Sequence, residues 1–236
     1  MENARNIAFK DFGKRDGMTT GQVADVFTKV ADTYDEVWTT RNHRGHIYVA
    51  EGVADYFQAD VMGFVRILDV GAGTGMLAEQ LWTRGFRQID GLDPSTGMMT
   101  EAMKKGVYTD YYLEFMDGHT IGKLATDSYD GLVAAAAFNT GLLPCAALLE
   151  MARLVKPGGL ICFGIPHACF TDVKEYNNRL EPLMQRMELD GMWKLLDKKH
   201  HDDFYDNANP GNVFRYIVHA SDVDVKYYVE KLCHAC

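Results

Sequence analysis

No uninterrupted apolar run in this sequence approaches the roughly 20 residues that a membrane-spanning helix needs. The N-terminal stretch MENARNIAFKDFGKRDG also lacks the apolar centre of a secretory signal peptide. Internal repeats, low-complexity tracts and linkers rich in proline or serine are missing too. These absences predict one continuous cytoplasmic protein with no membrane partner, and they leave its oligomeric state open.

Basic residues are fewer than acidic ones, with 24 Lys and Arg against 33 Asp and Glu, so the net charge is −9. Proteins that hold nucleic acids gain affinity by neutralising phosphates with Lys and Arg. The acidic balance therefore predicts no nucleic-acid partner. The longest basic cluster, residues 198–201, is followed at once by Asp202 and Asp203, as in a solvated surface segment of mixed charge.

Cysteine is scarce and odd in number, the five residues being Cys145, Cys162, Cys169, Cys233 and Cys236. Such a scattered set does not suggest a disulfide framework. The tail Cys233-His-Ala-Cys236 resembles half of a zinc site, but no second pair of Cys or His has matching spacing, so we predict no metal. Cys145 follows a loop and begins a helix, where a thiol pKa can fall, although a small buried residue is the alternative interpretation.

The chain does contain a regular alternation of short apolar runs and helical patterns. The apolar runs predict strands at residues 64–70, 88–93, 111–116, 129–138 and 160–165. Helices between them favour a mostly parallel sheet covered on both faces. Two extended stretches, 193–205 and 213–220, flank a turn signal at 207–211 and predict an antiparallel hairpin. The expected fold class is α/β, a Rossmann-like doubly wound sheet of seven strands with this hairpin at its C-terminal end.

Several local signals fix where helices begin and end. Ser95 is a plausible N-cap for a helix that ends near Gly106, and Pro144 suits the first turn of a helix at 144–155. Another helix is expected near 173–189. The length of 236 residues suits one domain rather than two. We therefore expect a loose segment at 1–18 and a single domain at 19–236.

Within that domain, residues 19–60 carry two helical patterns that precede the first strand, and we interpret them as a lid. Residues 64–166 form the expected cofactor-binding core, and 167–236 the C-terminal helix and hairpin. The core contains the loop Asp69-Val-Gly-Ala-Gly-Thr-Gly75 at the end of the first strand. Glycines there let the backbone turn sharply and pass close to a ligand.

Asp93 ends the second predicted strand, twenty residues after Gly73, where a carboxylate can accept hydrogen bonds from a ribose diol. A strand-turn-helix bend without any ligand can carry the same glycines. Asp93, the pair Asp117-Gly118 after the third strand and the turn Lys156-Pro-Gly-Gly159 together favour a nucleoside site instead.

The glycine spacing indicates which nucleoside is bound. Dinucleotide-binding folds use Gly-x-Gly-x-x-Gly, which brings a helix N-terminus to a pyrophosphate. Here the spacing is Gly71-x-Gly73-x-Gly75, with Met76 in the place of the third glycine. A ligand without phosphates is therefore favoured over NAD. S-adenosylmethionine is the common one, and Asp69 would complement its ammonium group.

The sequence resembles the class I S-adenosylmethionine-dependent methyltransferase superfamily in ILDVGAGTG at 67–75 and RLVKPGG at 153–159, over roughly residues 20–166. More narrowly, it is similar to the Williams-Beuren syndrome region methyltransferase-like proteins of animals. That similarity lies in YDEVW at 34–38, GLDPSTGM at 91–98 and LPCA at 143–146, and it weakens after about residue 170. The resemblance implies a methyltransferase that uses S-adenosylmethionine.

Carried over by motif, the resemblance implies that the glycine loop lines the methionine part of the cofactor and Asp93 holds the ribose. Met98 would flank the adenine, and Asp117 would accept from its amino group. Tyr34 matches an aromatic residue that closes over the cofactor, although Tyr34 and Met98 could equally be core residues. The expected cofactor-binding set is Tyr34, Asp69, Gly71, Ala72, Gly73, Asp93, Pro94, Met98, Asp117, Gly118 and Ala134.

The methyl acceptor is expected beyond the carboxyl ends of the fourth and fifth strands. Asn139 and His167 follow those strands, and His46 on the N-terminal segment could join them in a substrate site. Methyl transfer from a sulfonium relies on alignment and desolvation, and it needs a base only if the acceptor arrives protonated. His167 is the candidate base, with an exposed loop histidine as the alternative.

Residues 138–141, FNTG, stand where enzymes that methylate amino groups of DNA carry Asn/Asp-Pro-Pro-Tyr/Phe. That difference and the acidic charge disfavour a nucleic-acid acceptor. A small-molecule acceptor is the first hypothesis. The alternatives are a protein side chain and a non-catalytic partner protein that has kept the cofactor pocket, while the glycine spacing disfavours a nicotinamide-dependent reductase.

Overall fold

The computed structural model describes residue 15, residues 17–221 and residues 227–228. Seven strands form one sheet: β1 (Arg66–Val70), β2 (Gln88–Leu92), β3 (Asp110–Tyr112), β4 (Tyr129–Ala135), β5 (Val155–Pro166), β6 (Trp193–Asp206) and β7 (Asn209–Val218). Their spatial order is β3-β2-β1-β4-β5-β7-β6. β1 to β5 pair in parallel, whereas β7 is antiparallel to both β5 and β6. The expected mostly parallel sheet with a C-terminal antiparallel hairpin is thus confirmed.

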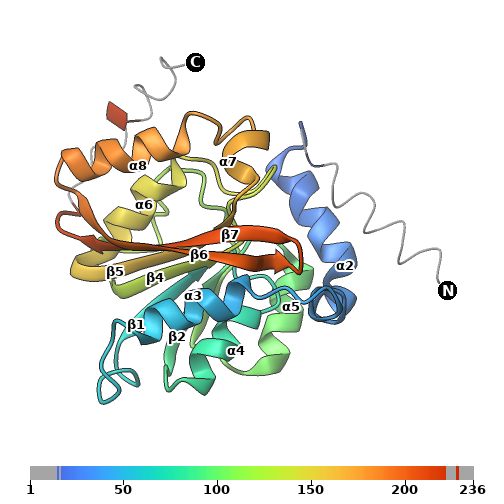
Figure 1. Cartoon of the computed structure of the whole chain (residues 1–236). Coiled ribbons are helices and arrows are strands. Elements are labelled where there is room, and N and C mark those ends of the chain that lie inside the picture. Colours follow the sequence, from blue (N-terminus) through green and yellow to red (C-terminus); the bar gives the residue numbers. More distant parts are fainter. Residues whose placement is uncertain (1–14, 16, 222–226, 229–236) are drawn as a thin grey trace.

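Helices cover both faces of this sheet (Figure 1). They are α2 (Thr20–Thr40), α3 (Gly45–Ala54), α4 (Met76–Thr83), α5 (Thr96–Lys105), α6 (Ala147–Leu154), α7 (Cys169–Asp172) and α8 (Leu180–Leu189). In Figure 1, α3, α4 and α5 lie on one side of the sheet and α6 and α8 on the other. The long helix α2 packs on α5 at the edge of these layers.

Adjacent strand residues supply the two faces with separate apolar cores. Ile67 and Val133 pack with the buried residues of α3 and α4, and Leu68 and Leu132 pack with those of α6 and α8. Successive side chains of a strand point to opposite faces, so a strand covered on both sides must be apolar throughout. This is why the central strands show continuous apolar runs instead of alternation.

Two helices begin with side-chain caps, and the one at Ser95 was predicted. The Thr19 hydroxyl accepts from the backbone N–H of Gln22 at 3.3 Å, and the Gln22 side chain accepts from the Thr19 N–H at 2.9 Å, which completes a capping box at α2. Ser95 caps α5 by accepting from the Met98 N–H at 3.2 Å. Gly106 ends that helix with a φ of 65°, the left-handed conformation that glycine adopts without strain.

Other predicted boundaries were wrong. The third strand stops at Tyr112, because the chain then leaves the sheet and brings Phe115 and Met116 to a cavity described below. Pro144 precedes α6 instead of lying in its first turn, and its carbonyl accepts from the Ala147 N–H at 3.0 Å. The C-terminal helix starts only at Leu180, after the short α7. The hairpin turn is shorter than predicted, since β7 already begins at Asn209.

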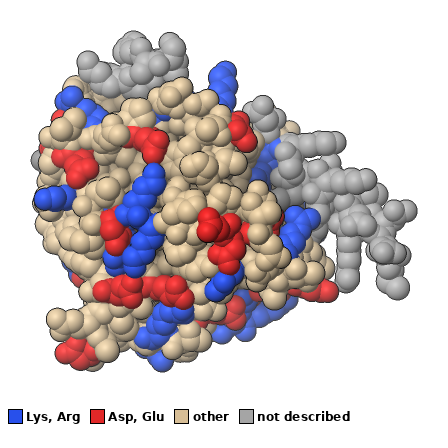
Figure 2. Space-filling view, in the orientation of Figure 1, with Lys and Arg blue, Asp and Glu red and all other residues tan. Residues whose placement is uncertain are grey.

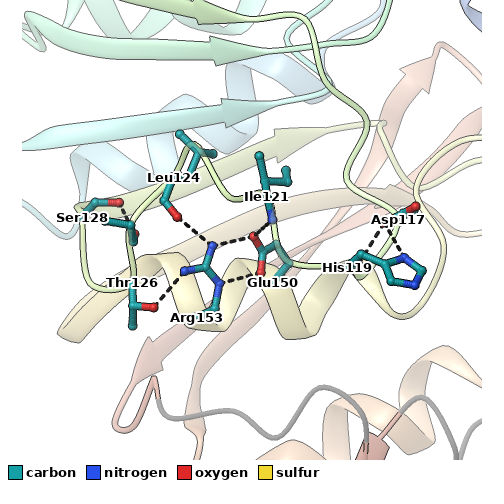
Figure 3. Close-up of polar contacts among 9 residues, drawn as sticks. Asp117, His119, Ile121, Leu124, Thr126, Ser128, Glu150 and Arg153 are labelled. Atoms are coloured by element: carbon teal, nitrogen blue, oxygen red, sulfur yellow. Dashed lines mark hydrogen bonds and ion pairs between the residues drawn. The ribbon is translucent and has the colours of Figure 1, made fainter.

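A buried ion pair holds the long connection between β3 and β4 (Figure 3). The Glu150 side chain is fully buried on α6 and accepts from the Ile121 N–H at 2.8 Å. Arg153, one turn further on, donates to the Glu150 carboxylate at 2.7 Å, to the Leu124 carbonyl at 2.9 Å and to the Thr126 hydroxyl at 2.8 Å. These bonds satisfy backbone groups that no helix or strand would otherwise pair in this segment.

The tail Cys233-His-Ala-Cys236 and nearly all of the predicted loose segment lie outside the described residues. Among the residues described, no helix is long and apolar enough to cross a membrane, and no cluster of three potential metal ligands occurs. Cys145 is a free, buried thiol. Burial raises the pKa of its thiol to about 12, with a further rise from Glu175, so the lowered pKa considered above does not occur.

Candidate functional site

A cavity of about 1100 Å³, which includes space open to solvent, lies at the carboxyl ends of β1, β2 and β4 beneath α2. We call it the main cavity. Open parallel sheets bind ligands at this edge, and small-ligand pockets span roughly 300–1,000 Å³. Its walls come from residues 69–77, 92–95, 115–116 and 135–143, from the inner face of α2, and from Arg15, His43, His46 and Tyr205.

The glycine loop forms the floor of the main cavity. Gly71, Gly73 and Gly75 have φ values of 69°, 54° and 87°, which side chains with a Cβ rarely adopt. A Cβ on Gly71 would also lie only 2.7 Å from the Cβ of Ala137. The Gly71 and Ala72 N–H groups donate to the Leu92 carbonyl at 2.8 and 3.1 Å, which fixes the loop on β2. The loop is therefore rigid and leaves its outer backbone surface to a ligand.

Asp93 lines the cavity directly after β2. Its carboxylate accepts from the backbone N–H groups of Gly73 and Ser95, each at 2.9 Å. An ionised carboxylate offers about four acceptor positions, so two remain beyond these bonds. Burial raises the pKa of Asp93 to about 6, although both amides oppose the rise. The remaining positions suit a ribose diol.

Asp69 is a second carboxylate in the floor, and only 1% of its surface is exposed. The Tyr108 hydroxyl donates to it at 2.8 Å. Burial is the main cause that raises the pKa of Asp69 to about 7, and the nearby Asp93 adds to the rise. A buried carboxylate of this kind is stabilised in its charged form by a cation. Asp69 and Asp93 together thus fit a ligand that carries both a positive charge and a ribose, as S-adenosylmethionine does.

The lid helix α2 contributes aromatic rings to the roof. Phe27, Tyr34 and Trp38 all line the cavity, with successive ring centroids 6.3 and 5.9 Å apart. Tyr205, on the distant strand β6, meets Trp38 edge-on at 4.9 Å. The roof is therefore apolar and built from flat side chains of two separate parts of the chain.

Polar contacts tie the lid to the cofactor-binding core. The Thr28 and Ser95 hydroxyls are 2.9 Å apart, and Asp35 accepts a hydrogen bond from Thr74 of the glycine loop. Lys105 of α5 reaches the Asp35 and Glu79 carboxylates at 2.6 Å each. The position of α2 over the cavity thus depends partly on charge pairs.

Two histidines close one end of the main cavity. His43 and His46 stack with ring centroids 5.4 Å apart. The Nδ1 of His43 lies 3.2 Å from the Tyr205 carbonyl oxygen, which can only accept, so this nitrogen carries the hydrogen. His46 is 8% exposed, and its Nδ1 is buried without a hydrogen-bond partner. Burial is the main cause that lowers the pKa of His46 to about 4, and His43 lowers it further.

The structure brings most of the predicted site residues to this cavity: Tyr34, His46, Asp69, Gly71, Ala72, Gly73, Asp93, Pro94 and Asn139 all line it. Tyr34 and His46 lie far from the glycine loop in sequence. Tyr34 is brought to the cavity by α2, and His46 by the start of α3. Both oxygens of Asn139 form local hydrogen bonds. Its backbone carbonyl accepts from the Tyr176 hydroxyl, and its side-chain oxygen accepts from the Thr140 N–H.

Four of the expected cofactor-binding residues do not line the cavity. Met98 is fully buried between α5 and α2, where it packs with Val30 and Trp38. Ala134 points into the core of the sheet, and the following alanines line the cavity instead. Asp117 turns outward and accepts from both the backbone and the ring of His119 (Figure 3). Gly118 packs on α6, since a Cβ there would lie 2.5 Å from the Cβ of Ala146.

His167, the candidate base, is also outside the cavity. It follows β5 as expected, but its side chain is exposed. The ring lies beside the hairpin, with Nδ1 3.5 Å from the Asn212 side chain and the ring centroid 6.3 Å from that of His200. The hairpin draws this histidine to the outer side, so the alternative of an exposed loop histidine describes it better.

Sequence reasoning missed Arg15, Trp38, His43 and Tyr205 as cavity residues. The position of Trp38 could have been predicted from the sequence, because it stands four residues after Tyr34 and so lies on the same face of the helix. No sequence pattern indicates the position of Tyr205, because the folded hairpin is what brings β6 next to α2. The contact between His43 and Tyr205 joins residues 162 positions apart.

The fold and the site together have the features of class I methyltransferases. The sheet has seven strands in this order, the glycine loop lacks the Gly-x-Gly-x-x-Gly spacing of dinucleotide-binding folds, and the acidic residue Asp93 follows β2. Comparison with known proteins agrees, since residues 68–163 match the family described as a methyltransferase domain. Residues 68–163 are thus similar to a methyltransferase domain, and these similarities support S-adenosylmethionine as the cofactor.

Individual relatives are similar over part of the chain. Human methyltransferase-like protein 27 is 34% identical over 134 residues, which are 55% of this chain and 51% of the human protein. The malonyl-[acyl-carrier protein] O-methyltransferase of Yersinia pestis is 29% identical over 142 residues, 60% of this chain and 49% of that protein. The chain therefore spans about half the length of these relatives.

A solved S-adenosylmethionine-dependent methyltransferase from Leishmania major shares the fold with a TM-score of 0.61. The alignment covers 84% of this chain and 82% of that structure at 19% identity. It reaches further along the chain than the sequence similarity does, so the fold extends beyond the matched domain.

Proposed function

We propose that the chain transfers a methyl group from S-adenosylmethionine to a small-molecule acceptor that enters the main cavity. The observation that carries this proposal is the cavity itself. Its floor presents the glycine loop with Asp69 and Asp93, and its roof is an apolar lid. One side can thus hold the methyl donor while the other encloses an acceptor away from water, as methyl transfer by alignment and desolvation requires.

In this proposal the chain's own residues divide the work of holding the donor. The backbone of Gly71 and Gly73 lies against the methionine part, and Asp69 pairs with its ammonium group. Asp93 accepts from the ribose hydroxyls while its amide contacts keep it in place. Tyr34 covers the donor from α2. When bound, S-adenosylmethionine supplies an electrophilic methyl group on a positively charged sulfur.

Three observations support a small acceptor over a macromolecule. The cavity is roofed by α2, so a long polymer would have to displace the lid. Acidic and basic side chains are interspersed on the face drawn in Figure 2, and the net charge of −9 is unfavourable for binding nucleic acid. A similar protein of Yersinia pestis is by its name an O-methyltransferase of ubiquinone biosynthesis, and ubiquinone is a small molecule.

The test is to incubate the protein with S-adenosylmethionine labelled in its methyl group and with a cell extract separated by size. We expect label in the low-mass fraction, and we expect Asp93→Ala to abolish it while Asp60→Ala, an exposed carboxylate, does not. Label confined to the protein fraction would favour a side-chain acceptor. Tight donor binding without any labelled product would favour a non-catalytic partner protein, and either outcome contradicts the proposal.

A further inference from the structure

We propose that His46 accepts the proton of a hydroxyl group on the methyl acceptor, and that this acceptor is a flat hydroxylated ring of the phenol type. This inference rests on the proposed function and names its substrate class and its base. It replaces His167, which lies outside the cavity, with a histidine from the start of α3.

The state of the His46 ring in the structure points to a ligand. The residue is more than nine-tenths buried, it lines the main cavity, and its Nδ1 has no hydrogen-bond partner. A buried polar atom without a partner costs about 1–3 kcal/mol, and it is uncommon in folded proteins. A hydroxyl of the acceptor would fill the vacant hydrogen-bonding position. For this, Nδ1 must hold the lone pair and Nε2 the hydrogen.

The surroundings keep this imidazole uncharged, so that its lone pair is available. Burial, His43, Lys105 and Arg84 all lower the pKa of His46, and only Asp35 among the neighbouring charges raises it. An ordinary exposed histidine would be partly protonated near neutral pH. His46 is therefore neutral across the whole range in which the enzyme would work.

The shape of the acceptor follows from a row of rings along the roof. Phe27, Tyr34, Trp38 and His43 follow one another with centroid distances of 6.3, 5.9 and 5.6 Å, and the row ends at His46. Aromatic side chains stack on flat apolar rings at about these distances. A ring that lies along this row would bring its hydroxyl to His46.

The charge on the roof distinguishes a hydroxyl acceptor from an amine. Arg15 lines the cavity with 5% exposure and lies over the Phe27 ring at 5.5 Å. A cation there repels a protonated amine. The carboxylates among the described lining residues are Asp69 and Asp93, and both are committed to the donor side. A neutral or anionic hydroxyl compound is thus the better match.

In the proposed step, the acceptor oxygen attacks the methyl carbon from the side opposite the sulfur. An O–C bond forms as the C–S bond breaks, and the electron pair of the C–S bond returns to sulfur. As this bond forms, the hydroxyl becomes more acidic and passes its proton to Nδ1 of His46, so that the oxygen is not left with a positive charge. The products are the methyl ether, S-adenosylhomocysteine and an imidazolium. Even a weak base suffices, because a hydroxyl whose oxygen is being methylated is far more acidic than a free phenol.

His46 can pass this proton on to solvent. Together with His43, it also lines a second hollow on the outer side, which is bounded by Asp35, Thr39 and Glu79. That hollow opens to solvent, and the carboxylates of Asp35 and Glu79 lie in its wall. The imidazole therefore stands between the enclosed cavity and a route by which the proton leaves.

The experiment compares wild type with His46→Asn, whose amide can still form a hydrogen bond but cannot take a proton, and with His219→Asn, an exposed histidine, as the control. Binding of S-adenosylmethionine is measured first by calorimetry, and we expect all three proteins to agree within about twofold. Catechol, 4-hydroxybenzoate and aniline then serve as acceptors with the labelled donor. General bases contribute about 10²–10⁴-fold, so we expect His46→Asn to lower kcat for the phenols at least about 100-fold.

A readout that does not depend on turnover accompanies this comparison. In protein with ¹⁵N-labelled histidine and bound S-adenosylhomocysteine, 4-hydroxybenzoate should shift the Nδ1 resonance of His46 and leave that of His219 unchanged. The inference is wrong if the wild type binds the donor but methylates neither phenol, if it methylates only aniline, or if His46→Asn keeps its rate. Failure to bind the donor at all would instead contradict the proposed function.

Discussion

Asp69 and Asp93 place two carboxylates in the floor of one cavity, and each is held in a different way. Asp93 has two backbone amides and remains open to a ribose, whereas Asp69 has a single tyrosine hydroxyl and almost no exposure. Asp69 is the less satisfied of the two and has the higher pKa. Its need for a cation is therefore the more sensitive property to test.

We expect the ligand-free protein to lose stability as the pH rises from 5 to 8. The pKa of Asp69 is about 7 in the folded protein and near 3.8 when unfolded. The folded state thus holds this proton more tightly, and its contribution is lost as the pH rises through 7. At about 1.4 kcal/mol per pKa unit, the loss over the whole interval from pH 3.8 to 7 is at most about 4 kcal/mol, of which about 3 kcal/mol falls above pH 5. Urea unfolding at each pH measures it.

Asp69→Asn should reduce that pH dependence, because the amide does not titrate and Asp93, whose pKa is also raised, then carries what remains. Asp60→Asn, at an exposed position, should leave the dependence as in the wild type. Saturating S-adenosylmethionine should also reduce the slope in the wild type, since its ammonium group favours the ionised carboxylate. An unchanged slope in Asp69→Asn would show that another group carries the titration.

For single residues, the sequence best predicted the positions that depend on local backbone conformation. Gly71, Gly73 and Asp93 follow from a strand that must turn and from the strand beside it. Met98 and Asp117 were misplaced, because one turn of α5 and the early end of β3 decide where those side chains point. His43 was missed because its partner Tyr205 lies on a strand whose position no local pattern reveals.

Residues of α2 line the roof of the main cavity, and we propose that access to the cavity depends on this helix. Lys105 bridges Asp35 of α2 and Glu79 of α4, and it is only 15% exposed. Partly buried charge pairs contribute more than exposed ones, which are worth about 0–1 kcal/mol. The bridge thus stabilises the position of α2 over the cavity.

We expect Lys105→Gln to speed the dissociation of S-adenosylmethionine about three- to tenfold, since the lid then opens more often. The matched control is Lys104→Gln on the same helix, whose exposed lysine pairs with Glu101 one turn away. Stopped-flow displacement measures both rates. Equal rates in the two variants would mean that the charge bridge does not hold the lid.

The loop between β3 and β4 depends on one buried acid. We expect Glu150→Gln to lower the free energy of unfolding by about 3–5 kcal/mol, because it leaves the nearly buried Arg153 without its charge partner. Glu114→Gln breaks the exposed pair with Lys123 and should cost less than about 1 kcal/mol. Chemical denaturation of both variants checks this. Similar losses would contradict the anchoring role drawn from Figure 3.

Elements were predictable where caps and periodicity agree. Ser95 and Gly106 mark the two ends of one helix by a side-chain hydrogen bond and a backbone preference, and the structure confirms both. Pro144 was misread, because a proline is compatible with the turn before a helix as well as with its first turn. The predicted ends that were wrong are those that depend on tertiary contacts.

At the scale of the whole molecule, the alternation of strands and helices was enough to predict the sheet class. Parallel neighbours require crossover helices, and the antiparallel hairpin is signalled by its turn. The packing of the hairpin was not predictable. It brings Tyr205 to the lid and draws His167 away, and so it decides which side chains complete the cavity.

The central claim is that the glycine loop with Asp93 binds S-adenosylmethionine. Calorimetric titration of the protein with S-adenosylmethionine, and separately with NADH, tests it most directly. We predict micromolar binding of S-adenosylmethionine, none of NADH, and a loss of about 10- to 100-fold in affinity for Asp93→Ala, because hydrogen bonds to a charged group contribute about 1.5–3 kcal/mol. Binding of NADH with no binding of S-adenosylmethionine, or full affinity in Asp93→Ala, would contradict the claim.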